Sequence, residues 1–374
     1  MKYLLIPNQQ ALLVQINGEG HSVESISLDA NHGYTSLQKT IASFTPDSII
    51  VTSTRLGSLM DVFRAKQAIT GSTKVTDALS NNVAYGLASF AACSIPNVNH
   101  VLLHSNGEKL EQVSKKGYVF CPVDAVGLDD EIVCRDWQQL LLLTSLYHQR
   151  GGDSYVLRDI VDDDTLWITS WFNGRDFYLP TASSINYHLY DNMGPVTNMP
   201  SCLTWGINKD NQLFIEMQKA KKLLHLAGYR GPVSIRFNGG LAERWYASYL
   251  PSYLAGLSEL LQGSLADLIY TISRGEKVHE GLRGGYGMSV GLSIPPFPYE
   301  GNGKGMTVFG VEKPALKHLW LDDVVYNNGV IVIDNAEGRI GYVTARGDNP
   351  EKARWRVKRT ISRLDCHGLQ YNLV

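Results

Sequence analysis

Short apolar runs alternate with amphipathic stretches over the first hundred residues of the chain. KYLLIP (residues 2–7) and DSIIVTST (47–54) have the length and composition of buried strands, and we expect ALLVQIN (11–17) to pair with the first as another strand. TSLQKTIASF (35–44) and NNVAYGLASFAAC (81–93) have the period of helices. This alternation predicts a parallel sheet covered by helices.

The pattern changes to short strands between residues 98 and 160. One long helix is expected over DWQQLLLLTSLYHQ (136–149), with Asp136 as its N-cap, because a carboxylate there can accept a hydrogen bond from a first-turn N–H. The strands expected in this part are HVLLHS (100–105), GYVFCPV (117–123) and EIVC (131–134).

Longer strands and long helical stretches follow. Asn173-Gly174 is a strong hairpin signal, and Gly239-Gly240 separates two further apolar runs. We expect one helix from residue 214 to about 228 and one continuous helix over residues 253–275. The strands expected in this part are SYVLRDIV (154–161), TLWITSWFNG (165–174), DFYLPTASSI (176–185), GPVSIRFN (231–238) and LAERWY (241–246).

The last ninety residues are rich in strand patterns until a final basic helix. In that helix Ala353, Val357, Ile361 and Leu364 recur on one face at the spacing of a core contact. Its lysines and arginines then occupy the other face. A solvated surface is therefore favoured over a nucleic-acid site for these charges.

Length, net charge and cysteine content exclude several classes of protein. A chain of 374 residues is too long for one compact core and predicts two to three domains, and a net charge of −2 creates no field that attracts nucleic acid or a membrane. Five cysteines are scattered without a C-x-x-C pair, which favours reduced thiols over a structural zinc site. No apolar stretch approaches the roughly 18 residues of a membrane span. We expect a cytoplasmic protein.

The chain resembles the phosphoribosylamine–glycine ligases, the ATP-grasp enzymes of purine synthesis. The C-terminal segment contains Gly338-Arg339, then Val343-Thr344-Ala345 and Gly347, in the same order as in the C-terminal segment of that family. WFNGRDFYLP (171–180) resembles the hairpin of the family's large lobe, and DNMGPVTNMP (191–200) is similar to its Gly-Pro-x-Thr loop. The matching segments are collinear from end to end.

The resemblance implies an α/β fold of ATP-grasp architecture. It would comprise an N-terminal doubly wound α/β domain (residues 1–97) and a split grasp module with a small lobe (98–160) and a large lobe (161–284), followed by a β-rich C-terminal domain (285–374). It also implies an ADP-forming carbon–nitrogen ligase. Such an enzyme uses ATP and Mg²⁺ to activate a carboxylate as an acyl phosphate, and it would join a small amino acid, glycine by analogy, to an amine.

The nucleotide side of the resemblance departs from the family. Val83 and Pro122, or its neighbour, stand at the two lysine positions, and no lysine occurs between residues 76 and 108 or between 117 and 207. The acidic run Asp129–Glu131 stands where the family has a Gly-rich flap over the phosphates. The magnesium motif keeps Glu243, a candidate metal ligand, but has Trp245 where a second ligand is needed.

The substrate side is altered in part. IPNQQALL (6–13) replaces the Gly-rich opening loop, and its Pro7 lacks an N–H donor. The later loop is retained, so the resemblance implies that Gly194, Pro195, Thr197 and Met199 bind substrate. Arg236 and Arg244 flank Glu243 in sequence; they are candidates to pair with it or to bind an anionic cofactor in place of the lysines.

Two functions of different class remain open at this point. In the first, the chain is a divergent ADP-forming carbon–nitrogen ligase with a rebuilt nucleotide site. In the second, it is a pseudoenzyme that keeps the scaffold and uses the interlobe cleft to bind a ligand or a protein partner. The missing lysines favour the second function, and the retained substrate loop favours the first.

Overall fold

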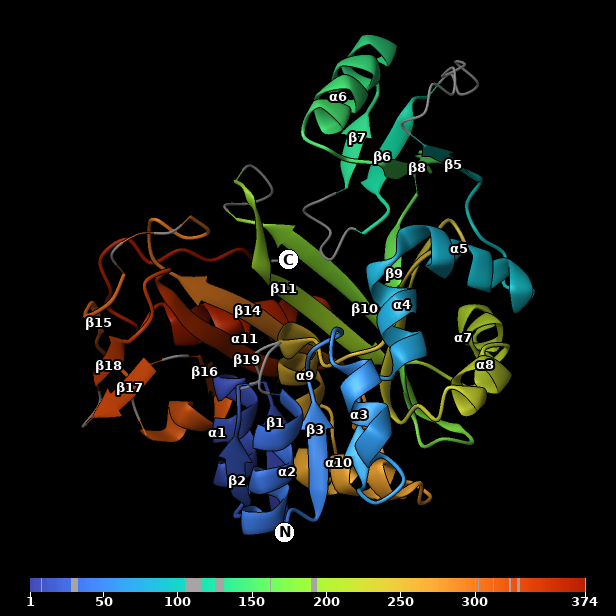
Figure 1. The fold of residues 1–374 in the computed structure, drawn as a ribbon. Coiled ribbons are helices and arrows are strands. Elements are labelled where there is room, and N and C mark those ends of the chain that lie inside the picture. Colours follow the sequence, from blue (N-terminus) through green and yellow to red (C-terminus); the bar gives the residue numbers. More distant parts are fainter. Residues whose placement is uncertain are drawn as a thin grey trace.

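The computed structural model describes most of the chain, and its elements are drawn in Figure 1. The structure describes residues 1–7, 9–27, 33–104, 116–124, 131–161, 163–189, 194–299, 301, 303–311, 313–322, 324–327 and 330–373. No helix among these residues combines the length and the apolar character needed to cross a membrane.

The N-terminal part contains a four-stranded parallel sheet, in the order β2-β1-β3-β4. Its core is aliphatic and includes Leu4 and Ile49. The expectation of a strand at 11–17 is wrong, because this segment lies in helix α1 and buries Ala11, Leu12 and Ile16. A parallel pair needs a crossover, and α1 supplies it between β1 and β2. The elements are β1 (Lys2–Ile6), α1 (Gln10–Gly18), β2 (Ser22–Ser25), α2 (Gly33–Phe44), β3 (Ser48–Val51), α3 (Gly57–Phe63) and β4 (Ile69–Thr70).

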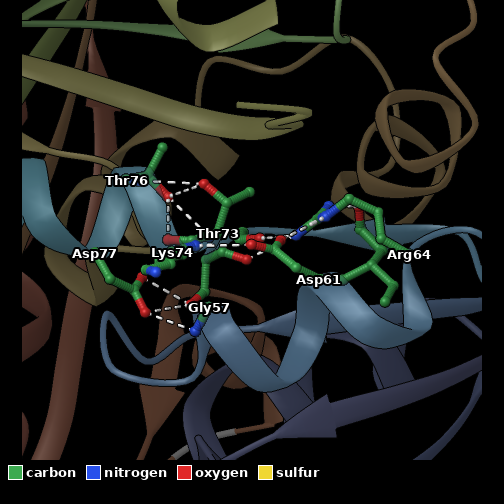
Figure 2. A network of polar contacts seen from close by, with 10 residues as sticks. Gly57, Asp61, Arg64, Thr73, Lys74, Thr76 and Asp77 are labelled. Carbon is green, nitrogen blue, oxygen red and sulfur yellow. Dashed lines mark hydrogen bonds and ion pairs between the residues drawn. The ribbon is translucent and has the colours of Figure 1, made fainter. Parts of the chain in front are cut away.

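A polar network joins α3 to the next helix, α4 (Lys74–Asn81), as Figure 2 shows. Asp77 of α4 accepts a hydrogen bond from the N–H of Gly57, at the start of α3, at 2.6 Å. Asp61 of α3 in turn accepts one from the N–H of Lys74, at the start of α4, at 3.0 Å. Each helix thus places a carboxylate at the N-terminus of the other, where unpaired N–H groups and the helix dipole favour negative charge.

Asp77 makes the stability of this part depend on pH. Burial raises the pKa of its carboxyl from 3.8 to about 6, although hydrogen bonds from Ser72 and Gly57 oppose the shift. The folded state therefore binds a proton that the unfolded state releases, so stability should fall as pH rises from about 4 to 6. Because this carboxyl is only partly buried, we expect a loss of about 1–2 kcal/mol over that range.

The substitution Asp77→Asn should remove that loss, since the amide oxygen can still accept from Gly57 and does not titrate. The measurement is the free energy of unfolding in urea at several pH values between 4 and 7. Asp210→Asn, at an exposed position, is the control and should keep the wild-type profile. Superimposable profiles for wild type and Asp77→Asn would contradict this account of Asp77.

A second four-stranded sheet lies apart from the others at the top of Figure 1, and we call it, together with helix α6, the small lobe. Its strand order is β5-β8-β6-β7, and all pairs are antiparallel. Phe120, Leu140 and Tyr155 belong to the core between sheet and helix. Asp136 accepts from the N–H of Gln138 at 2.9 Å, which confirms the predicted N-cap. The elements are β5 (His100–His104), β6 (Tyr118–Pro122), β7 (Ile132–Cys134), α6 (Trp137–Gln149) and β8 (Ser154–Asp159).

The largest sheet has eight strands in the order β13-β12-β9-β10-β11-β14-β19-β16, and we call it, with the helices packed on it, the large lobe. The predicted hairpin at Asn173-Gly174 joins β9 to β10, and the side chain of Asn173 accepts from two N–H groups of the turn. The strands are β9 (Thr165–Phe172), β10 (Phe177–His188), β11 (Val196–Gly206), β12 (Gly231–Asn238), β13 (Leu241–Tyr246), β14 (Tyr286–Ser293), β16 (Leu319–Leu321) and β19 (Arg339–Gly347).

Helices of the large lobe are shorter than the periodicity predicts. The continuous helix expected over 253–275 is instead two helices, because the chain turns after Ser258 and Ser264 caps the second helix by accepting from the N–H of Asp267. Gly263 lies within this break. The helix expected from residue 214 to about 228 is likewise divided in two, and its first part begins earlier, at Gln212. The helices of this part are α5 (Val83–Ala92), α7 (Gln212–Gln218), α8 (Lys221–Leu226), α9 (Pro251–Ser258) and α10 (Leu265–Arg274).

The end of the chain packs on the large sheet. Helix α11 (Pro350–Ile361) buries Ala353, Val357 and Ile361 in the same core cluster as β14 and β19, so the predicted apolar face is confirmed. Its N-cap, Asn349, accepts from the N–H of Lys352 at 2.8 Å. This part of the chain also contains a three-stranded sheet, formed by β15 (Thr307–Val308), β17 (Val324–Asn327) and β18 (Val330–Ile333). The 3₁₀ helix η2 (Lys313–His318) precedes β16.

Candidate functional site: a buried charge cluster in the interlobe cleft

A cleft separates the small lobe from the large sheet. Its inner cavity, of about 440 Å³, is lined by Glu131 and Arg158 from the small lobe and by Tyr187, Arg236 and Glu243 from the large lobe. An outer cavity of about 970 Å³ shares Tyr187 and Arg236 with it and extends along β10. Because they share lining residues, the two cavities adjoin one another along the same cleft. We refer to it as the interlobe cleft.

Five charged side chains meet at the inner end of this cleft, and none exposes more than 9% of its side chain. Two lie on the small lobe, and the others lie on neighbouring strands of the large sheet. With three arginines and two glutamates the group carries a net charge of +1. Charges so far from water must be paired with one another to be tolerated. We call this set the charge cluster; its members are Glu131, Arg158, Arg236, Glu243 and Arg244.

Glu131 is held by all three arginines of the cluster. Its Oε2 accepts from Nη2 of Arg158 at 2.5 Å and from Nη2 of Arg236 at 2.7 Å, and its Oε1 accepts from Nη1 of Arg244 at 2.8 Å. Burial alone would raise the pKa of Glu131, but the guanidinium charges more than offset it and lower the pKa to about 2. Glu131 is therefore ionised throughout the physiological range.

Glu243 faces two of the same arginines. Its Oε1 lies 2.8 Å from Nη1 of Arg158, and its Oε2 lies 2.8 Å from Nε of Arg236. These contacts are close in distance, but the N–H groups of Nη1 and Nε are not aligned with an acceptor and make no hydrogen bond. Both oxygens of Glu243 are consequently held by charge within the protein.

The antiparallel pairing of β12 with β13 explains why the arginines converge. Arg236 lies directly opposite Arg244 in this register, a like-charge pair that would be destabilising alone. Alternation places Ile235 and Phe237, the neighbours of Arg236, in the hydrophobic core on the other face of the sheet. Glu131 bridges the two arginines from the small lobe, so the cluster joins the two lobes electrostatically.

The structure brings together three residues that the sequence singled out. Sequence analysis proposed that Arg236 and Arg244 either pair with Glu243 or bind an anionic cofactor. In the structure Arg236 pairs with Glu243, whereas Arg244 binds Glu131. Sequence reasoning missed Arg158. An arginine within SYVLRD (154–159), otherwise an apolar strand, was the available signal, because a charge there must be buried with a partner or face solvent.

The retained loop is built into the large sheet. Thr197 and Met199 are buried, and the Oγ1 of Thr197 accepts from the N–H of Met199 at 3.0 Å. Gly194 donates its N–H to the carbonyl of Leu189 at 2.8 Å, and a Cβ at Gly194 would lie 2.7 Å from that oxygen. Pro195 accepts from the N–H of Leu189. These contacts give the loop a structural role, and substrate binding by Gly194, Pro195, Thr197 and Met199 stays a prediction.

The positions matched to nucleotide-binding groups offer few ligands to a magnesium nucleotide. Val83 is buried, and Trp245 is fully buried and stacked on Phe90. Within the described ranges there is no group of three or more histidine, cysteine, aspartate or glutamate side chains able to hold a metal ion. Asp129 and Asp130 lie outside the described residues. The residues described here do not fit Mg²⁺, which prefers several oxygen ligands in octahedral geometry.

Comparison with known proteins identifies the fold. Neither a family model nor a curated protein matches the sequence. Among solved structures, phosphoribosylamine–glycine ligase from Thermotoga maritima matches with a TM-score of 0.77 and 16% identity, covering 99% of both chains. Biotin carboxylase from Campylobacter jejuni, in complex with β,γ-ATP, matches with a TM-score of 0.65 and 10% identity over 99% of this chain and 92% of that chain. L-amino acid ligase from Bacillus licheniformis matches with a TM-score of 0.64 and 12% identity over 98% of both chains.

These matches extend over nearly the full length of the chain, as the collinear motifs predict. At such low identity they establish architecture alone. The predicted resemblance is confirmed at that level: this chain has the fold of phosphoribosylamine–glycine ligase and of other ATP-grasp ligases.

Proposed function

We propose that this protein is a catalytically degenerate member of the ATP-grasp fold, whose interlobe cleft binds a small ligand without using Mg·ATP. The observation that carries the proposal is the position of Glu243 between Arg158 and Arg236. A metal ion bound by Glu243 would lie beside both guanidinium groups, whose like charge disfavours a dication, unless Glu243 left them. Removing one partner from a buried ion pair costs about 3–5 kcal/mol, and Mg²⁺ would have to repay that cost.

The distribution of positive charge supports the same proposal. No lysine occurs between residues 117 and 207, a span that includes β6, β7 and β8 of the small lobe. The arginines of the charge cluster are already committed to Glu131 and Glu243. A triphosphate, which carries several negative charges, would therefore meet a cluster with only one net positive charge.

Calorimetric titration and thermal unfolding with Mg·ATP test the proposal. We expect no saturable heat and no rise in melting temperature at millimolar Mg·ATP. A ligand at 100 times its Kd would stabilise the folded state by about 2.7 kcal/mol, so binding of ordinary affinity would be plain. MgCl₂ alone controls for ionic strength. A saturable shift specific to the nucleotide would contradict the proposal.

The second candidate is a divergent ADP-forming carbon–nitrogen ligase, with an amino acid and an amine as substrates and ATP and Mg²⁺ as cofactors. Its support is the outer cavity of about 970 Å³, which is open beside Arg236 and large enough for a substrate. ADP release in the presence of ATP, Mg²⁺, glycine and a panel of amines would favour this candidate. If no amine increases ADP release above the ATP-only control, the ligase hypothesis fails.

A further inference from the structure

Glu131 occupies the position that an external anion would take among arginines. Three guanidinium groups from three strands, β8, β12 and β13, donate to its single carboxylate at 2.5–2.8 Å. Guanidinium groups bind carboxylate and phosphate oxygens with this chemistry, through short charge-assisted hydrogen bonds. The arrangement is that of an oxyanion site with a glutamate in it.

One carboxylate does not use all the donors that converge there. Nε and Nη1 of Arg158 and Nε of Arg236 are buried and make no hydrogen bond. Glu243 lies near two of these atoms without aligned geometry. A phosphate group offers more acceptor oxygens than a carboxylate, so it could accept from donors that Glu131 leaves unsatisfied. Buried donors without a hydrogen bond are rare in folded proteins, and a bound ion is one of their explanations.

The site is reachable from the cleft. Glu131, Arg158 and Arg236 all line the inner cavity, which adjoins the outer cavity at Arg236 and Tyr187. The three arginines also exceed the two glutamates by one charge. A small anion can therefore approach a region whose net charge favours it.

We propose that Arg158, Arg236 and Arg244 form an oxyanion-binding site for the phosphate or carboxylate group of a ligand, and that Glu131 occupies it as an internal competitor. A ligand anion enters by displacing the Glu131 side chain. This inference rests on the proposed function, in which the cleft takes a ligand other than Mg·ATP. It assigns to that ligand an anionic group and to Glu131 an inhibitory role.

Rescue of a Glu131→Ala variant by anions is the decisive experiment. The variant should melt at a lower temperature than the wild type, because three arginines then share one carboxylate. Inorganic phosphate, in the absence of nucleotide and metal, should restore at least half of the lost melting temperature in a saturable manner. Acetate is the second probe, since it replaces the missing carboxylate itself. Sodium chloride at equal ionic strength should have little effect.

Two further variants keep the test sharp. Glu259→Ala removes a largely buried carboxylate of another kind, one bound by His318 and Thr344, and its stability should not respond to phosphate or acetate. Glu131→Gln preserves side-chain volume and is used if the alanine variant does not fold. It should bind phosphate at least tenfold more tightly than the wild type in calorimetric titration.

The inference is overturned if neither anion raises the melting temperature of Glu131→Ala beyond the chloride control. It is also overturned if wild type and the Glu131 variants respond equally, because Glu131 would then not be a competitor. Neither result would contradict the proposed function, which is tested separately by Mg·ATP binding. Conversely, Mg·ATP binding by the wild type would overturn the proposed function and leave the phosphate rescue standing.

Discussion

Replacing Glu243 by alanine is expected to lower the free energy of unfolding by about 3–5 kcal/mol. The variant leaves Arg158 and Arg236 buried with Glu131 as their remaining counter-charge, and Glu131 is shared with Arg244 as well. Uncompensated charge on side chains that are almost completely shielded from water is the cause of the loss. Since domains are typically stable by only 5–15 kcal/mol, the effect should be obvious in urea denaturation followed by circular dichroism.

The exposed ion pair between Arg274 and Glu276 supplies the control. Its Nε–Oε1 distance of 2.9 Å is close to the distances in the charge cluster, but both side chains are about half exposed. Exposed pairs contribute little, because water and salt screen them. Glu276→Ala should therefore leave the denaturation curve unchanged within error. If the two variants lost similar stability, burial would not be what distinguishes the charge cluster.

The elements of the fold could be predicted well where one pattern repeated without competition. The alternation in the N-terminal part gave the parallel sheet, and Ala353, Val357 and Ile361 gave the buried face of α11. ALLVQIN was mistaken for a strand because a short apolar run has no distinct period. The break between α9 and α10 was missed because tertiary contacts decide whether a helix continues past Gly263.

The charge cluster was harder to predict, because it is assembled across long distances in the chain. Glu243 was singled out because it matches a magnesium motif of the resembled family, and Arg236 and Arg244 because they flank it in sequence. Their partner Glu131 is more than a hundred residues away, and only the contact of the two lobes brings it near. Sequence reasoning placed Glu131 in an acidic run that stands where the resembled family has a Gly-rich flap over the phosphates. In the structure its charge is neutralised by three arginines.

Trp245→Ala is expected to lower the free energy of unfolding by about 3–5 kcal/mol, chiefly by leaving a cavity. The indole is fully buried, stacks on Phe90 of α5 with ring centroids 4.8 Å apart, and donates from Nε1 to the Oγ of Ser89 at 2.8 Å. It therefore fastens α5 to β13, next to the charge cluster. The measurement is urea denaturation followed by far-ultraviolet circular dichroism, because tryptophan fluorescence would itself change with the substitution.

Two further variants test whether Trp245 matters for packing or for the absence of a metal ligand at its position. Trp355 on α11 is 59% exposed, so Trp355→Ala should change stability by less than about 0.5 kcal/mol. Trp245→Asn places an amide where the resemblance has a magnesium ligand, yet it should be as unstable as Trp245→Ala and should gain no Mg·ATP binding. Because Glu243 stays held by Arg158 and Arg236, one added ligand cannot complete a metal site. Mg·ATP binding by Trp245→Asn would show instead that this tryptophan alone separates the chain from a nucleotide-binding protein.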